Sequence, residues 1–583
     1  MTEQLKLKLN DSKATRWGAL VIVAFTMMAA YYVNDVVAPL KTMLETDLAW
    51  SSTDFGFFTG GYSFLNVFFL MLIWGGLILD RFGIRFTGKL ATILMVGGTA
   101  LEYYAMTGLA GTDATLFGIN EIFGYKTGVF VAFAGYSIFG VGAEVAGITV
   151  SKIIAKWFKG KELATAMGVQ VALARIGSQA GYAVAIPLAR AFGISTPVLL
   201  GLVLLLGGMI AFFVFTVMDK KLDKQMEAAA IAAGTEDEEE KFSFKDVKNI
   251  LVNPGFWLIA LLCVLFYSCV FPFQKFASEL MIIKYGINEN VAGTFAGLPA
   301  LGALILTPVF GGFIDKRGKS ASIMLLGSAM LICVHFIYAI PDINYWLVAI
   351  VLMIILGIAF SLVPSAMWPA VAKIFPVSQL GTAYALIFFI QNIGLWGIPT
   401  LIGWVLDAYC ISGKKPDGTN MYDYTVPMCI FTGIACLSLV VALLLKKADR
   451  KYGYKLEEHN RKSGYRMMEI PEGKVSLLDA VPVRCGHITT EWEGECAVLA
   501  YPRFKYEWMR RFLLPKGMSP DIHVRLEEHG TAVWNLIDGH RTVREIISLL
   551  ARHFGKEENY IPRVTAYVMQ LRKDGFIQLT IRN

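Results

Sequence analysis

Two ionisable residues lie inside long apolar segments, where a charged side chain is costly and usually marks a binding site or a pathway. Glu144 stands in the run GVGAEVAGITV, and Arg175 stands in VALARIGSQAG. If both segments are helices, the two residues lie equally far from the turn WFKGKE that joins them. At 1.5 Å per residue, about 15 residues place both side chains roughly 20 Å from that turn, at one depth.

A carboxylate and a guanidinium at one depth permit two interpretations. They can form a structural ion pair that joins the two helices, and breaking such a buried pair would be expensive. Alternatively, they can bind a zwitterion, with Glu144 taking an ammonium group and Arg175 taking a carboxylate through two hydrogen bonds. The spacing alone favours neither.

Polar residues in the second half of the chain are further candidate ligands of the same site. Gln391 and Asn392 occupy the depth in their segment that Arg175 has in its own, and Ser361 lies in the preceding segment. Neutral amides can hydrogen-bond a peptide backbone without a counter-charge. Tyr267 could line the same site, although ordinary packing explains it equally well.

The composition places these residues in a membrane protein. Soluble globular proteins average 45–50% apolar and about 25% charged residues, whereas this chain of 583 residues has 55% and 17%. The apolar excess must therefore face lipid. Basic residues at membrane edges account for the net charge of +7, and no nucleic-acid partner is expected, because lysine and arginine do not gather with aromatic residues in a polar context.

Twelve stretches are long and apolar enough to span a bilayer as helices. The sequence thus predicts an all-α polytopic membrane protein. The twelve stretches cover residues 17–40, 53–79, 88–108, 127–155, 163–190, 196–218, 255–282, 290–313, 321–340, 344–372, 379–407 and 425–446.

Loop charges predict the orientation of these helices. With the N-terminus in the cytoplasm, 15 basic residues fall in the inner loops and 6 in the outer loops. Cytoplasmic loops carry the excess of lysine and arginine, so both termini are expected inside. No cleavable signal peptide is expected, since the first apolar run is too long for one.

Charge and hydropathy divide the chain into six parts. We expect an N-terminal tail, two six-helix bundles separated by a linker, a connector and a soluble domain. These parts cover residues 1–16, 17–218, 219–254, 255–446, 447–500 and 501–583, where the third is the linker and the fifth the connector. Two halves of six helices suggest pseudo-symmetry.

A short motif, G-x-x-x-D-[RK]-x-G, occurs once in each half, in corresponding loops. Glycine permits a tight turn, and the aspartate and cations can form a charge cluster that locks neighbouring helices. The first copy runs from Gly76 through Asp80, Arg81 and Gly83 to Arg85, and the second from Gly311 through Asp315, Lys316 and Gly318 to Lys319.

This repeat resembles the signature loop of the major facilitator superfamily, which is present in both halves of its members. The resemblance implies a transporter of twelve helices that works by alternating access, without covalent chemistry, and therefore not an enzyme. It also implies that the inner gate is controlled by Asp80, Arg81, Arg85, Asp315 and Lys316.

Within the superfamily, residues 17–446 resemble the branch of animal lysosomal dipeptide transporters. The resemblance implies that Glu144 and Arg175 engage the two termini of a dipeptide, but it carries no role onto Asn34 or Asp35. The segments that carry it include Trp157–Leu163, Met167–Ser178, Met367–Pro369 and Gln379–Tyr384, and the first two are the most specific.

Two other functions stay open. The chain could be a proton-coupled transporter of organic anions, in which Arg175 binds a carboxylate and Glu144 titrates. It could also be a membrane receptor that signals through its C-terminal domain. We expect a monomer in a bacterial inner membrane, without a cofactor; the spacing Cys485-x-His487 with Cys496 is only a weak indication of a metal site.

The C-terminal residues have the pattern of a soluble domain. Thr542 and Glu545 form an expected capping box at a helix start, and a second helix, Ile561 to Lys573, precedes a strand, Phe576 to Ile581. This arrangement resembles the small winged-helix protein D of pyrroloquinoline quinone biosynthesis, a peptide binder. The resemblance implies a peptide ligand, or a regulatory role toward the transporter.

Overall fold

The computed structural model describes most of the chain. The described residues are 9–111, 115–158, 162–233, 244–375, 379–415, 417–458, 477–485, 488–494, 496–502, 519, 521–554 and 560–581. They divide into two compact units, Met1–Lys462 and Ser463–Asn583, each described here by itself.

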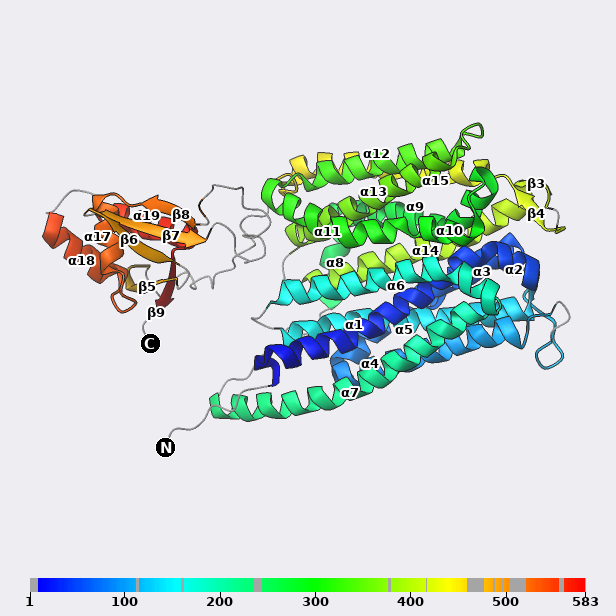
Figure 1. Cartoon of the computed structure of the whole chain (residues 1–583), viewed down its shortest axis with the longest axis horizontal. Coiled ribbons are helices and arrows are strands. Elements are labelled where there is room, and N and C mark those ends of the chain that lie inside the picture. Colours follow the sequence, from blue (N-terminus) through cyan, green and yellow to red (C-terminus); the bar gives the residue numbers. More distant parts are fainter. Residues whose placement is uncertain are drawn as a thin grey trace. The chain divides into compact units, whose positions relative to one another are not determined.

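The first half of the larger unit is helical (Figure 1). Its helices are α1 (Lys13–Val36), α2 (Lys41–Leu48), α3 (Ser52–Phe68), α4 (Met71–Thr107), α5 (Thr127–Trp157), α6 (Leu163–Phe192) and α7 (Thr196–Ala233). A hairpin of β1 (Glu121–Ile122) and β2 (Tyr125–Lys126) precedes α5.

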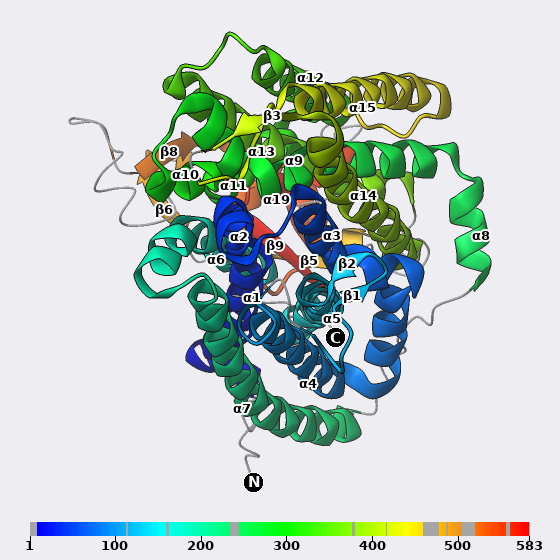
Figure 2. The ribbon, with the colours of Figure 1, turned by 90° about the vertical axis from the view of Figure 1, so that its right-hand side faces the viewer.

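The second half is also helical (Figure 2). Its helices are α8 (Phe244–Val252), α9 (Pro254–Tyr285), α10 (Glu289–Ala296), α11 (Leu298–Arg317), α12 (Ser320–Ala339), α13 (Trp346–Ile374), α14 (Leu380–Tyr409) and α15 (Thr425–Tyr452). A hairpin of β3 (Ile411–Lys414) and β4 (Asn420–Tyr422) separates the last two helices.

Helix α4 consists of two antiparallel segments, because the backbone leaves the helical conformation at Gly83 (φ 73°, ψ 174°). Before Gly83 the chain runs parallel to α5, since Gly75 lies against Val145 and Asp80 bonds Lys152 farther along. After Gly83 the order of contacts is reversed, as the pairs Ala91–Gly142 and Gly98–Gly135 show. A positive φ favours glycine, and the predicted turn therefore lies where the motif places it.

Within the described residues, nine helices are long and apolar enough to cross a membrane, or ten if the bent pair of α3 and α4 counts as one span. That pair bends by 58°. The helices that meet this criterion do not include α6. Helix α4 covers parts of two of the expected spans, residues 53–79 and 88–108. The helical membrane architecture agrees with the prediction, whereas the number of twelve spans stays a prediction.

Two expected parts of the chain contain elements that the sequence did not predict. Helix α7 continues to Ala233, well into the expected linker of residues 219–254. The expected connector of residues 447–500 contains strands of the soluble domain, which begins before residue 501. These strands have five to seven residues each, and apolar runs this short do not by themselves identify a strand.

The smaller unit combines antiparallel strands with three helices. β5 (Ala480–Arg484) pairs with β9 (Ile577–Ile581), while β6 (Thr489–Glu493), β7 (Cys496–Pro502) and β8 (Asp521–Arg525) form a three-stranded sheet. The helices are α17 (Glu528–Leu536), α18 (Val543–Phe554) and α19 (Tyr560–Lys573).

The expected capping box is confirmed at the start of α18. The N–H group of Thr542 donates to Glu545 (2.8 Å), and the N–H group of Glu545 donates to the hydroxyl of Thr542 (3.2 Å). The structure adds no support for a metal site at Cys485, His487 and Cys496. His487 lies outside the described residues, and no cluster of metal ligands occurs among those that are described.

Candidate functional site

The two halves of the larger unit meet at one end of the bundle. We call the end with the turns at Gly83 and Gly318 the motif end, and the opposite end the far end. At the far end, Gly56 of α3 lies directly against Gly403 of α14, with no space for a side chain between the backbones. Arg190 of α6 there donates to the side chains of Asn290 and Glu289 at the start of α10.

Contacts between the halves stop near the middle of the bundle. We compared the hydrogen bonds, ion pairs and ring contacts that join described residues of the two halves. On α6, the contact nearest the motif end is that of Arg175 with the ring of Phe360. On α14 it is made by Trp396, whose ring packs against Phe68 (centroids 4.8 Å apart). The structure is therefore joined at the far end and not at the motif end.

Glu144 lies on α5, with its side chain half-buried. Its carboxylate accepts a hydrogen bond from the hydroxyl of Tyr62 on α3 (3.0 Å). No cation of the described residues lies within 4.0 Å of it. The carboxylate is thus held in place by a neutral group, and its charge is not balanced by a fixed partner.

Arg175 lies on α6 and is also half-buried. Its guanidinium carbon is 5.6 Å from the ring centre of Tyr31 on α1 and 4.9 Å from that of Phe360 on α13. Rings can hold a guanidinium by cation–π attraction while leaving its N–H groups free to bind a ligand. Among the described residues, none supplies a carboxylate to Arg175.

The structure does not contain the structural ion pair that the sequence left open. No salt bridge joins Glu144 to Arg175, although both residues are described. Both side chains instead face neighbouring helices of the interior. This arrangement leaves one negative and one positive group of similar depth without mutual compensation.

The four neutral candidates differ in their surroundings. Tyr267 is buried next to Phe360, and its hydroxyl accepts a hydrogen bond from Trp368 (3.2 Å). Gln391, also buried, accepts a weak bond from the thiol of Cys263 (3.4 Å).

The other two are bound within their own helices. Ser361 is fully buried and donates to the carbonyl of Gly357 (2.7 Å). Asn392 donates to the carbonyl of Phe388 (2.9 Å), while its buried amide oxygen has no partner. The structure thus brings Tyr267 near Arg175 through Phe360 and does not bring Ser361 to it.

A buried ion pair between the halves was not predicted. Lys275 of α9 lies 3.1 Å from the carboxylate of Asp35 on α1 and donates to the carbonyl of Asn34 (2.5 Å). Ser178 of α6 donates to the same carboxylate (2.5 Å). Lys275 stands inside an expected span, so the rule that singled out Glu144 could have found it.

A second network lies nearer the far end. Lys41 pairs with the fully buried Glu279 of α9 (2.5 Å), which also accepts from Tyr424 and lies 3.8 Å from Lys415. Lys41 belongs to the first half and the other three belong to the second. Together with the pair of Asp35 and Lys275, this network fastens the halves at the far end.

At the motif end of the first half, Asp80 and Arg85 each make a charged contact with a residue outside the motif. Asp80 accepts a hydrogen bond from Lys152 of α5 (3.1 Å), and Arg85 lies 3.2 Å from Asp223 of α7. The sequence missed the acidic partner on α7, because Asp223 was assigned to the linker. Both contacts join helices of one half and not the two halves.

The remaining motif residues make fewer contacts. Arg81 lies over the ring of its neighbour Phe82 (5.6 Å), and Lys316 is exposed. The side chain of Asp315 lies outside the described part of the structure. Nearby, hydrogen bonds from Trp17 and Arg16 lower the pKa of Glu162, which keeps this link between α1 and the start of α6 ionised.

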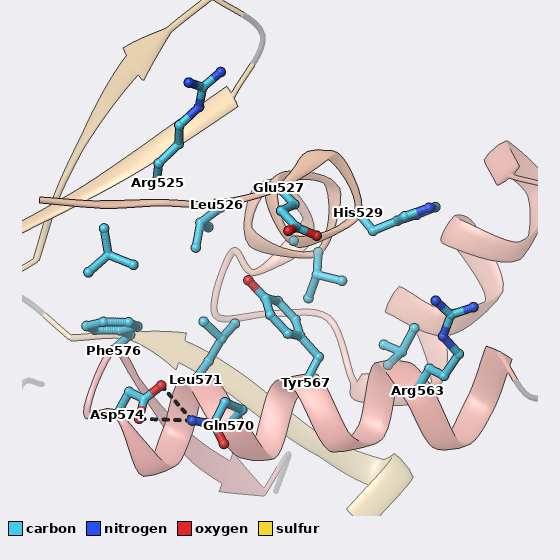
Figure 3. A pocket seen from close by; sticks show the side chains of 14 residues that line it. Arg525, Leu526, Glu527, His529, Arg563, Tyr567, Gln570, Leu571, Asp574 and Phe576 are labelled. Carbon is cyan, nitrogen blue, oxygen red and sulfur yellow. Dashed lines mark hydrogen bonds between the residues drawn. The ribbon is translucent and has the colours of Figure 1, made fainter.

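The smaller unit has a pocket of about 410 Å³ between β8 and α19 (Figure 3). Tyr567 of α19 points into it, and its hydroxyl lies against Gly530 of α17. Leu526, Val564 and Phe576 make the apolar part of the lining. Burial raises the pKa of Tyr567, so the phenol stays neutral.

Residues 20–399 and 284–476 match the family model described as Major Facilitator Superfamily. The chain belongs to the major facilitator superfamily. Members of this superfamily are transporters and not enzymes, so the chain is an integral membrane transporter. Residues 518–577 match the model of coenzyme PQQ synthesis protein D, which agrees with the resemblance of the soluble domain.

Curated relatives carry a specific name. The "Lysosomal dipeptide transporter MFSD1" of Homo sapiens is 28% identical over 454 residues, which cover 76% of this chain and 88% of that protein. Its counterpart in Gallus gallus is 33% identical over 287 residues, which cover 47% of this chain and 62% of that protein.

Solved transporters of this superfamily share the fold. A point mutant of the nucleoside transporter NupG has a TM-score of 0.54 at 12% identity and covers 73% of this chain and 98% of its own. A bacterial homolog of the human lysosomal transporter Spinster, inward-facing and unoccupied, has a TM-score of 0.51 at 14% identity, covering 78% of this chain and 99% of its own. At these identities the likeness concerns the fold alone.

Proposed function

We propose that this transporter moves dipeptides or short zwitterionic peptides by alternating access. Glu144 binds the substrate ammonium, and Arg175 binds the carboxylate. One observation carries the proposal: two opposite charges, each half-buried in the interior, have neither each other nor any other described residue as a charged partner. A zwitterion would satisfy both, and the similarity to lysosomal dipeptide transporters points the same way.

The neighbouring residues take supporting roles in this proposal. Tyr62 positions the Glu144 carboxylate, and Tyr31 and Phe360 hold the guanidinium of Arg175. Of the other expected ligands, Tyr267 and Gln391 keep more exposed surface (6% and 9%) than Ser361 and Asn392, whose side chains bond their own helices.

The membrane orientation belongs to the same proposal. The motif end faces the cytoplasm of a bacterial cell, the protein acts as a monomer, and Asp80, Arg81, Arg85, Asp315 and Lys316 control the inner gate. Because the halves meet at the far end, substrate exchanges with the cytoplasmic side in this conformation.

A thermal-shift experiment on the purified protein tests the site. A dipeptide that stabilises the native chain should not stabilise Glu144→Ala or Arg175→Ala, because each variant lacks one anchor. Both variants should keep the Tm of the unliganded protein to within a few degrees. Equal stabilisation of the double variant by the same dipeptide would show that the site lies elsewhere.

The two alternatives predict different results. An organic-anion carrier needs no substrate ammonium, so N-acetylated dipeptides would still be transported; the dipeptide proposal expects their transport to be lost. A receptor that only signals would show no counterflow in liposomes. We expect counterflow even from a chain ending at Lys462, the last residue of the larger unit.

For the smaller unit we propose a peptide ligand. Its pocket lies beside β8, which pairs on one side with β7 and leaves its other edge without a described strand. A peptide could add to that edge and place apolar side chains against Tyr567 and Phe576. A pull-down from a synthetic peptide library should identify peptides that the native chain retains. A Tyr567→Ala variant should not retain these peptides, while its dipeptide transport should persist.

A further inference from the structure

An aromatic cluster fills the second half next to Arg175. We call it the aromatic subsite, and its rings come from α9, α13 and α14. Tyr267 stacks on Phe271 (centroids 5.5 Å apart), and the edge of Phe360 meets Phe271 (5.3 Å). Trp368 continues the cluster by stacking on Phe388 (4.8 Å).

The aromatic subsite is continuous with the carboxylate anchor. Phe360 is a member of the cluster and also lies 4.9 Å from the guanidinium carbon of Arg175. A carboxylate bound by Arg175 would therefore have aromatic rings within one side-chain length. The amino-group anchor, Glu144, lies on α5 of the first half, as Arg175 does on α6, and accepts a hydrogen bond from Tyr62.

The rings present apolar faces rather than polar groups. The indole N–H of Trp368 donates to the hydroxyl of Tyr267, and the backbone carbonyl of Trp368 accepts from the hydroxyl of Tyr384 (3.0 Å). These polar atoms therefore bond one another. Phe271, Trp368 and Phe388 nevertheless stay half-buried, although they lie among helices that face the other half. Protein atoms alone do not cover these ring surfaces.

We propose that the aromatic subsite binds the side chain of the substrate's carboxyl-terminal residue and favours a large aromatic or apolar one. The assignment to that residue follows because its own carboxylate is the group on Arg175. Large rings gain dispersion and hydrophobic energy against other rings. A cationic side chain is disfavoured, because the guanidinium of Arg175 already lies on Phe360. This inference rests on the proposed dipeptide function.

An isomeric pair of dipeptides tests the inference without changing composition or charge. Ala-Phe should bind about tenfold more tightly than Phe-Ala, which corresponds to about 1.4 kcal/mol, in isothermal titration of the full chain. Ala-Lys should bind more weakly than Ala-Phe. Equal affinities of the isomers, or a preference for Ala-Lys, would overturn the subsite.

Variants locate the preference. Phe271→Ala and Trp368→Ala should reduce the ratio of the two isomers toward one. Phe271→Leu keeps an apolar side chain in the core and controls for a folding defect. Its preference for Ala-Phe over Phe-Ala should lie between that of the native chain and that of Phe271→Ala. Phe313→Ala on α11, whose ring is 45% exposed, is the matched control and should retain all of it. A full ratio in both alanine variants would refute the assignment.

The two levels of the proposal fail differently. If no dipeptide binds, the dipeptide function is wrong. If Arg175→Ala binds all dipeptides normally, Arg175 is not the carboxylate anchor and the site lies elsewhere. If dipeptides bind through Arg175 but the isomers are indistinguishable, only the aromatic subsite is wrong.

Discussion

At the scale of single residues, the site depends on charges that lack a fixed counter-charge. Within the described part of the chain, the hydrogen-bond partner of the Glu144 carboxylate is Tyr62, at 3.0 Å. A hydrogen bond to a charged group contributes about 1.5–3 kcal/mol, and here it fixes the direction of the carboxylate. Tyr62 should therefore matter for affinity although it carries no charge.

Replacing Tyr62 by phenylalanine tests this role. We expect dipeptide affinity to fall roughly tenfold, because the carboxylate loses its orienting donor. The Tm of the unliganded protein should change little. Tyr104→Phe, at an exposed position on α4, is the control and should bind normally. Unchanged affinity in Tyr62→Phe would mean that Glu144 is held by something else.

A second residue-scale prediction concerns the buried pair of Lys275 and Asp35. Removing one partner leaves an uncompensated buried charge, whereas replacing both is often nearly neutral. Lys275→Met should therefore lower the Tm by several degrees, and the double variant with Asp35→Asn should recover most of that loss. A double variant less stable than Lys275→Met would contradict the expected compensation.

At the scale of elements, the sequence predicted much of the fold and only part of the site. Apolar length identified the helices, and the motif glycine placed the reversal at Gly83. The extension of α7 was missed because its charged, alanine-rich continuation has no apolar run long enough to span a membrane. The pairing of Lys275 with Asp35 could not be predicted, because one sequence does not show which helix of the second half faces α1.

The reversal at Gly83 makes an element-scale prediction. With φ at 73°, a side chain there is strained by about 1–2 kcal/mol. Gly83→Ala should lower the Tm and reduce transport, since it distorts the turn that joins the two segments of α4. Gly76→Ala, seven residues earlier in a regular helix with open space around it, should be neutral or slightly stabilising. Equal effects of the two variants would show that the turn is not strained.

At the scale of the whole transporter unit, the far end is the closed side. Two buried ionic contacts, Lys41 with Glu279 and Asp35 with Lys275, bridge the halves there, and both must break when the halves separate at that end. A substrate shifts the equilibrium only through the difference in its affinity for the two conformations. The far-end contacts therefore set how often the carrier opens to the opposite side.

Weakening these contacts should shift the population in a measurable direction. Spin labels at the exposed positions Phe192 and Tyr345, near the far end of opposite halves, report the separation there in a background without reactive cysteines. The double variant Lys275→Met and Asp35→Asn should increase the population with the longer far-end distance. A transported dipeptide should also increase that population in the labelled protein that keeps Lys275 and Asp35. Labels at Phe82 and Arg317, at the motif end, should show the converse shortening. If the far-end distance lengthens while the motif-end distance stays constant, the halves do not rock as rigid bodies and alternating access requires a different motion.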